Sequence, residues 1–190
     1  MDDANIESLI VRFGTEAILR YRLISDAESD SGLPEVFLGG FIASRLYDEL
    51  RCPIHIERPY TDMARELGIR LDPQLTKELG GLRADLAIYK GKVPTHIVEF
   101  KIFDEGTQPI KVVSDLAKAR KLASLKPVVA ILGIMICEKS RSPLASRLRL
   151  LEKEFGSPVC VGETQKSVDG KWNWCFGAVS SSRAGVKPDS

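Results

Sequence analysis

The sequence predicts an α/β protein with a mixed central sheet flanked by helices. Three observations support this fold class. Two segments with apolar residues at helical spacing come first, an alternating strand-turn-strand pattern covers 83–103, and a helical segment then leads to the continuous apolar run 127–137. A helix between two strands implies a right-handed crossover onto a neighbouring parallel strand, so we expect parallel and antiparallel pairs in one sheet.

The N-terminal part predicts two helices separated by a loop. Apolar residues from Ile6 to Leu19 form a stripe at helical spacing, which predicts a helix over 6–23. A second helix is expected over 35–50, because Pro34 suits the first helical position, where no backbone N–H is needed.

The middle of the chain predicts three strands. A short strand is expected over 54–60, followed by a mixed stretch, 61–81, of helical turns and loop that is a candidate insertion capping a site. The runs 83–89 and 95–103 then read as an antiparallel hairpin around a Gly/Pro turn.

The C-terminal part predicts further helices and strands. A helix is expected over 109–125, and the β-branched run 127–137 is typical of a strand buried on both faces. The Ser-Pro pair before 143–155 and the glycine after it predict a helix there. Two more strands are expected over 159–161 and 171–179.

Length and composition suit one domain over 1–180 with a loose tail over 181–190. The chain has 190 residues, 44% of them hydrophobic, and its 27 basic and 26 acidic residues give a net charge of +1. Bulk charge therefore does not indicate a strongly basic partner-binding surface. The four cysteines lack zinc spacing, and the absence of a signal-peptide pattern and of a long apolar run predicts a cytoplasmic protein without a membrane segment.

The hairpin carries charged residues where an ordinary strand carries Val or Thr. If 90–94 is a five-residue loop, Tyr89 faces Thr95, and counting back in twos places Asp85 directly opposite Glu99. Opposed residues have Cβ atoms about 4.5–5.5 Å apart, so the two acids would repel each other. A divalent cation between them removes the conflict, and Mg²⁺ favours oxygen ligands. A slip of one residue would move Asp85 to the other face.

Lys101 lies two residues beyond Glu99, so its side chain shares that face of the strand. The alternative interpretation is structural: a solvent-facing strand in which Arg83 and Lys101 form a charge network with Asp85 and Glu99.

The residues Asp85 in RADLAIY and Glu99-Phe100-Lys101 in HIVEFK resemble the signature of the PD-(D/E)XK nuclease superfamily, which has the restriction-endonuclease-like fold. The order helix, three strands, helix and strand over 35–137 is similar to the αβββαβ core of that superfamily. The motif proline is replaced by Ala84 here. An extra N-terminal helix before this core, and a helix and strands after it, would be additions particular to this chain.

The resemblance implies a metal-dependent nuclease that hydrolyses phosphodiester bonds. Asp85 and Glu99 would hold one or two Mg²⁺ ions, with the backbone carbonyl of Phe100 as a further ligand, and Mn²⁺ would substitute for Mg²⁺. The metal would activate a water and neutralise charge on the scissile phosphate. Lys101 would orient that water or stabilise the phosphorane, since nearby carboxylates oppose the low pKa that a lysine base needs.

Members of the superfamily often supply one more acid from the first core helix. Glu35, at the start of the helix 35–50, is the residue we expect in this role, and Asp48, Glu49 and Glu57 are the rivals. The alternative for Glu35 is an acidic residue that the helix dipole favours in the first turn.

The helix after the motif carries Lys111, Lys118, Arg120 and Lys121, which are expected to contact a nucleic-acid backbone. The alternative is a solvated polar helix face. The expected partner is nucleic acid, with DNA favoured over RNA, and cutting two strands with one site per chain would call for a homodimer. The rival functions are a catalytically silent module of the same fold that binds nucleic acid or protein, and an unrelated α/β protein with a structural hairpin.

Overall fold

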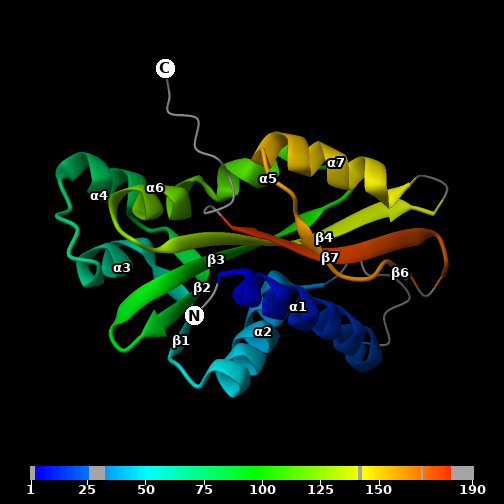
Figure 1. Ribbon diagram of the computed structural model, residues 1–190, viewed down its shortest axis with the longest axis horizontal. Coiled ribbons are helices and arrows are strands. Elements are labelled where there is room, and N and C mark those ends of the chain that lie inside the picture. Colours follow the sequence, from blue (N-terminus) through cyan, green and yellow to red (C-terminus); the bar gives the residue numbers. More distant parts are fainter. Residues whose placement is uncertain (1–2, 26–32, 141–142, 168, 181–190) are drawn as a thin grey trace.

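The computed structural model describes residues 3–25, 33–140, 143–167 and 169–180. These residues form an α/β protein whose sheet has seven strands in the order β1-β2-β3-β4-β7-β5, with β6 paired to β7 at the side. Helices cover both faces of this sheet (Figure 1). The predicted fold class, a mixed sheet flanked by helices, is confirmed, and the predicted tail 181–190 lies outside the described residues.

The strands are mostly antiparallel. They are β1 (Ile54–Pro59), β2 (Arg83–Lys90), β3 (Val93–Phe103), β4 (Val129–Lys139), β5 (Cys160–Val161), β6 (Gln165–Lys166) and β7 (Trp172–Ser180). The pair β3 and β4 is parallel, and all other pairs are antiparallel. The chain passes from β3 to β4 through helices, so the expected connection between parallel neighbours is confirmed.

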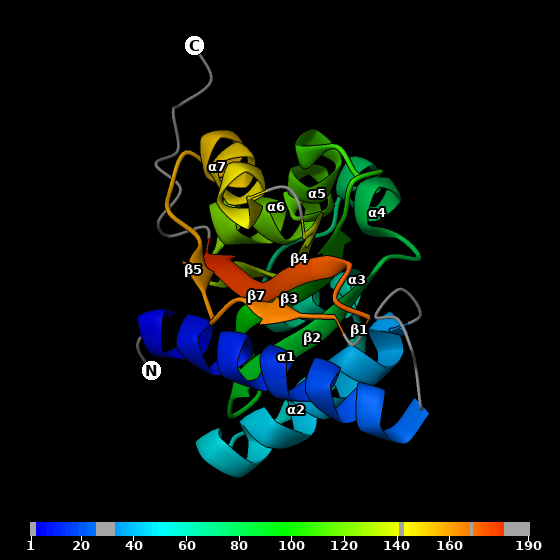
Figure 2. The ribbon, with the colours of Figure 1, turned by 90° about the vertical axis from the view of Figure 1, so that its right-hand side faces the viewer.

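An N-terminal helix pair covers one face of the sheet. Helices α1 (Asp3–Ser25) and α2 (Glu35–Leu50) lie side by side beneath the strands in Figures 1 and 2. Their buried residues, such as Phe13 and Leu38, share a cluster with Phe100 of β3 and Met135 of β4. Burying an apolar face of this kind is the main driving force for packing the pair onto the sheet.

Five further helices in the described chain are α3 (Tyr60–Glu66), α4 (Pro73–Leu79), α5 (Pro109–Asp115), α6 (Ala117–Leu125) and α7 (Leu144–Phe155). Their buried side chains belong to the second cluster, on the opposite face from α1 and α2 (Figure 2). That cluster takes Ile97 and Phe103 from β3, so residues with odd numbers on β3 face these helices and Phe100 faces the helix pair.

The hairpin turn is shorter than the sequence predicts. The predicted loop 90–94 is wrong, because Lys90 pairs with Val93 and only Gly91 and Lys92 lie between the strands. A bulge follows, in which Thr95 is the extra residue of β3 and its hydroxyl donates to the carbonyl of Ile88, 3.1 Å away. Pro94 explains the bulge, because proline has no N–H for the ladder and is found in central strands only at such irregularities.

The bulge restores the register that the sequence predicts further along the hairpin. Tyr89 pairs with Pro94 and not with Thr95, yet Leu86 pairs with Val98 as expected. Asp85 and Glu99 therefore occupy opposite positions on the two strands, as predicted, although the predicted loop length is wrong.

Other predicted elements differ in detail. Pro34 caps α2 from just outside the helix, with extended backbone angles, and so does Pro143 for α7. The predicted helix 109–125 is two helices that meet at Leu116, and the two-residue strand β6 was not predicted. Among the described residues, none of the helices combines the length and the apolar character that crossing a membrane requires.

Candidate metal and phosphate site

Three acidic residues lie at one level on three neighbouring strands. The pairs Leu86–Val98 and Ala87–Ile97 fix the register of β2 against β3. The next position along this register sets Asp85 against Glu99, as the sequence predicts.

The first strand brings a third acid to the same level. The pairs Ile56–Leu86 and Arg58–Ala84 bracket Glu57, so its position on β1 is opposite Asp85 on β2. Glu57 has a φ of 53°, the left-handed region that a non-glycine residue rarely adopts, and its side chain is exposed. Its charge contributes to raising the pKa of Asp85, although burial is the larger cause.

Asp85 is held in place by the backbone of the neighbouring strand. Its Oδ2 accepts a hydrogen bond from the N–H of Phe100 at 2.6 Å, and the side chain is half-buried. Since the N–H and C=O of one residue point to the same edge of an extended strand, the carbonyl of Phe100 also lies on the Asp85 edge. Burial raises the pKa of Asp85, while the Phe100 N–H and the Lys101 charge act in the opposite direction.

Glu99 is the most deeply buried charged group of this site, with 6% of its surface exposed. Its Oε1 accepts a hydrogen bond from the hydroxyl of Tyr60. Burial raises the pKa of Glu99 to about 8, and the charge of Asp85 adds to this effect. The Tyr60 hydroxyl, Lys118 and Lys101 all lower it, because each favours the ionised carboxylate.

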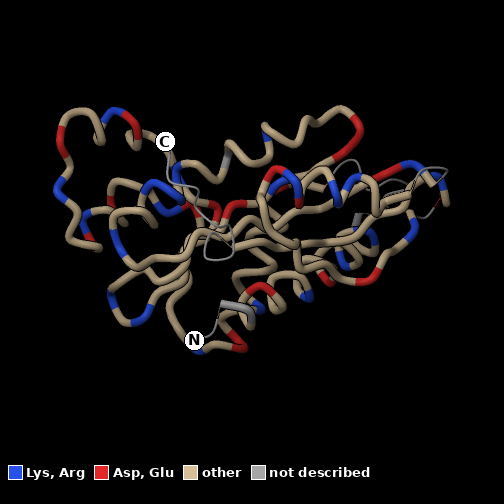
Figure 3. The backbone as a smooth tube through the Cα atoms, turned by 45° about the horizontal axis from the view of Figure 1, so that its top comes forward, with Lys and Arg blue, Asp and Glu red and all other residues tan. Residues whose placement is uncertain are grey.

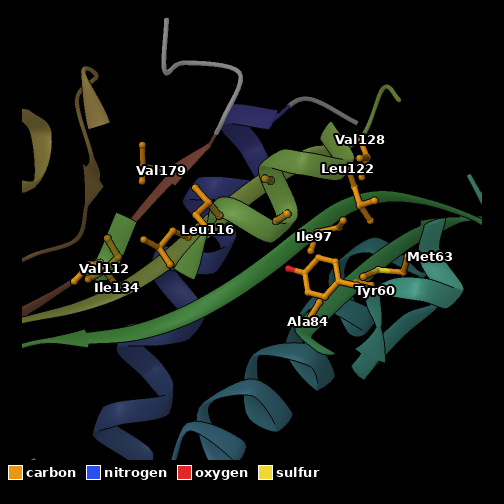
Figure 4. Packing of buried hydrophobic residues seen from close by; sticks show 14 of the residues in the cluster. Tyr60, Met63, Ala84, Ile97, Val112, Leu116, Leu122, Val128, Ile134 and Val179 are labelled. Carbon is orange, nitrogen blue, oxygen red and sulfur yellow. The ribbon is translucent and has the colours of Figure 1, made fainter. Parts of the chain in front are cut away.

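Tyr60 is the residue that sequence reasoning missed. It begins α3, directly after β1, and is fully buried among Met63, Ala84 and Ile97 (Figure 4). Burial, followed by the charges of Glu99 and Asp85, raises the pKa of its phenol well above the ordinary value, so the hydroxyl keeps its proton and remains a donor. No feature of the RPYTD stretch signals this contact. The sequence analysis placed Tyr60 at the end of the predicted strand 54–60, just before the segment 61–81 that is the candidate cap.

Lys101 and Glu35 form an ion pair. The Nζ of Lys101 lies 3.6 Å from the Oε1 of Glu35, which projects from the first turn of α2. Glu35 is thus placed against the lysine. Among the described residues, no group of three or more His, Cys, Asp and Glu side chains is arranged to hold a metal ion.

The rival acids at the far end of α2 are engaged elsewhere. Asp48 lies 3.8 Å from Arg51, and Glu49 receives a hydrogen bond from Arg12 at 2.9 Å. Of the three rival acids, Glu57 is therefore the one that lies beside Asp85.

The predicted phosphate-binding residues have different surroundings in the structure. Lys118 lies close enough to Glu99 for its charge to lower the pKa of that carboxyl. Lys121 forms a 3.3 Å ion pair with Glu78 of α4, and the guanidinium of Arg120 lies over the ring of Phe155 at 5.8 Å. Lys111 is exposed on α5. Figure 3 shows basic and acidic positions intermixed along the backbone.

The donors present fit a hard divalent cation. Asp85 and Glu99 offer two carboxylates at one level, and burial raises the pKa of both, which reflects negative charge that the protein alone compensates poorly. Mg²⁺ is commonly held by one or two carboxylates together with waters and substrate phosphates, so two such groups are a sufficient protein contribution.

Comparisons of the chain with models of protein families, with curated proteins and with solved structures find no match. The description of the chain therefore rests on its own structure. In the part that the structure describes, it is an α/β protein with a seven-stranded mixed sheet packed against helices, including an N-terminal helix pair.

Proposed function

We propose that the chain is a Mg²⁺-dependent nuclease of the PD-(D/E)XK superfamily that hydrolyses phosphodiester bonds in nucleic acid, with DNA favoured over RNA. One observation carries the proposal. Asp85 and Glu99 share a level on adjacent strands, and Lys101 follows two residues later on the strand of Glu99. This spacing combines two carboxylates that are able to hold a cation with a positive charge beside them.

The order of the elements supports the same proposal. From α2 to β4 the chain forms a helix, three antiparallel strands, a helical crossover and a parallel strand. This is the order expected of the αβββαβ core, with α3 and α4 inserted between its first two strands.

Each residue has a distinct role in the proposed reaction. Asp85 and Glu99 would hold the cation, together with the carbonyl of Phe100. A bound Mg²⁺ supplies an activated water and neutralises charge on the scissile phosphate. The Lys101 ammonium would orient that water or stabilise the phosphorane, and Glu35, which lies 3.6 Å from it, would hold the ammonium in position.

Lys118 is the residue of α6 that best fits contact with the scissile region, because its charge reaches Glu99. The remaining predicted contacts, by Lys111, Arg120 and Lys121, would lie farther along the bound strand. Of these, Arg120 is the least suited in its present position, since burial lowers the pKa of its guanidinium and the group lies over Phe155. A homodimer would be needed to cut both strands of a duplex.

A catalytically silent module of the same fold is the second candidate. The observation that favours it is the pKa of Glu99, about 8, which leaves this carboxyl largely protonated at neutral pH when no cation is bound. The net charge of +1 also gives the chain little general affinity for nucleic acid.

A cleavage assay separates these candidates. The purified protein is incubated with plasmid, linear and single-stranded DNA and with RNA, in the presence of Mg²⁺, Mn²⁺ or EDTA. Asp85→Asn and Lys101→Ala are tested beside Lys139→Ala, which removes another strand lysine in an ion pair, with Glu105 at 2.7 Å. Metal-dependent cleavage that is lost in the first two variants and kept in the third supports the nuclease. If none of the proteins cleaves any substrate but the wild type binds the metal in a separate titration, the silent module is supported.

A further inference from the structure

We propose that Tyr60 is a positioning residue for the cation site, whose hydroxyl fixes the orientation of the Glu99 carboxylate. The inference rests on the proposed function, because it assigns a role toward the same cation. Its basis is the hydrogen bond from the Tyr60 hydroxyl to Oε1 of Glu99, made in the interior of the protein.

The ring of Tyr60 has little freedom to move. The side chain is fully buried, and its neighbours on α3, Met63 and Ala64, are fully buried as well. The backbone N–H of Tyr60 donates to the carbonyl of Leu82 at 3.1 Å, which fastens the start of α3 to the residue before β2. Because the ring is enclosed and the backbone of Tyr60 is hydrogen-bonded, the position of the hydroxyl is fixed. The hydroxyl in turn defines where the accepting oxygen of Glu99 must lie.

The position of Oε1 determines the direction of the other carboxylate oxygen. With Oε1 held by the hydroxyl, the plane of the Glu99 carboxylate is fixed, and Oε2 has a defined direction relative to Asp85. Partners that orient metal-ligating side chains commonly change metal affinity or activity by about 10- to 100-fold when they are removed. Tyrosine suits this task because its phenol donates a hydrogen bond without adding a charge that competes with the cation.

A second buried tyrosine offers a matched control. Tyr89 is 3% exposed, and its hydroxyl donates to Oε2 of Glu66 at 2.6 Å and accepts from Nε of Arg58 at 3.3 Å. It lies on the same side of the sheet as Tyr60, in the same hydrophobic cluster, but its hydroxyl is bonded to Glu66 and not to Glu99. Phenylalanine at either position removes one oxygen atom and one hydrogen-bonded hydroxyl.

The test is a Mn²⁺ titration, followed by electron paramagnetic resonance, of the wild type, Tyr60→Phe, Tyr89→Phe and Asp85→Asn. Urea unfolding of each protein shows that it is folded under the titration conditions. Tyr60→Phe is expected to bind Mn²⁺ about 10- to 100-fold more weakly than the wild type, while Tyr89→Phe keeps the wild-type affinity. If Tyr60→Phe is too unstable, both substitutions are made in a Gly40→Ala background, because a methyl group at Gly40 meets no atom within 4 Å.

The outcomes separate this inference from the proposed function. A folded Tyr60→Phe protein that binds Mn²⁺ as the wild type does, while Asp85→Asn does not bind, overturns the role of Tyr60 alone. Equal losses in both phenylalanine variants also overturn it, because the effect would then belong to the cluster as a whole. A wild type without Mn²⁺ binding, or with binding that Asp85→Asn retains, overturns the proposed site and the role of Tyr60 with it.

Discussion

Replacing Glu99 by glutamine tests how strongly the folded protein opposes a charge at this position. The side chain is 6% exposed and accepts a hydrogen bond from Tyr60. Glutamine keeps the size of the side chain and an oxygen that accepts the same bond, and its NH₂ group provides a donor beside Asp85. The substitution therefore removes the ionisation of Glu99 and little else.

The expected effect on stability depends on pH in a defined direction. The pKa of Glu99 is about 8 in the folded protein against an ordinary 4.5, so between these values the folded state holds a proton that the unfolded chain releases. The free energy of unfolding of the wild type must then fall as the pH rises through this window. At about 1.4 kcal/mol for each pH unit, the whole interval corresponds to about 5 kcal/mol. The Glu99→Gln variant does not undergo this loss, because glutamine does not ionise.

The measurement is urea unfolding of both proteins in EDTA at about pH 5, pH 7 and pH 9. The free energy of unfolding of Glu99→Gln, minus that of the wild type, should increase from pH 5 to pH 7 and again from pH 7 to pH 9. Glu138→Gln on β4 is the control of opposite sign, because the hydrogen bond from Arg147 at 2.8 Å lowers the pKa of Glu138. That carboxylate stabilises the fold above its unfolded pKa and loses its contribution as the pH falls, so its variant is less stable than the wild type at pH 7. A stability difference for Glu99→Gln that is the same at all three pH values would refute the reasoning.

Three further predictions concern the packing of two glycines, the cap of α4 and the stabilisation of the fold by Mg²⁺. Gly133→Ala would place a methyl group 2.7 Å from ring carbons of Phe100 and should lower the free energy of unfolding by about 1–3 kcal/mol. Gly40→Ala on α2, where the methyl group meets no atom within 4 Å, should raise it by up to about 1 kcal/mol. Urea unfolding measures both changes, and a Gly133→Ala protein as stable as the wild type would contradict the packing. Asp72→Ala removes the cap of α4, where Oδ1 accepts from the N–H of Leu75 at 2.7 Å, and should cost about 1 kcal/mol in the same assay; no loss would mean that the cap is dispensable. Adding Mg²⁺ should raise the melting temperature of the wild type with increasing concentration, and a melting temperature independent of Mg²⁺ in calorimetry would argue against the site.

The level of the two acids could be predicted from the sequence because strand periodicity is strict. Once the runs around Asp85 and Glu99 are recognised as paired strands, only the register remains, and the apolar residues beside the acids restrict it. The loop length was predicted wrongly, since a two-residue turn with a bulge at Thr95 reaches the same register as a five-residue loop. Local sequence does not distinguish these two solutions.

The contacts between distant elements could not be predicted. Tyr60 meets Glu99 because α3 folds back over β3, and the sequence carries no local sign of that packing. The pairing of Lys101 with Glu35 likewise depends on where α2 begins relative to the end of β3. Periodicity fixes the face on which a side chain lies, but the partner on that face is decided by tertiary packing.

The proposed cation site is tested most directly by Mn²⁺ binding to the wild type and to Asp85→Asn at a pH above 8, where Glu99 is ionised. Asparagine at this position keeps an oxygen for the N–H of Phe100 and loses only the charge. We predict saturable binding to the wild type that is abolished or greatly weakened in the variant. Absence of binding to the wild type, or equal binding to both proteins, would contradict the claim that the paired acids hold a divalent cation.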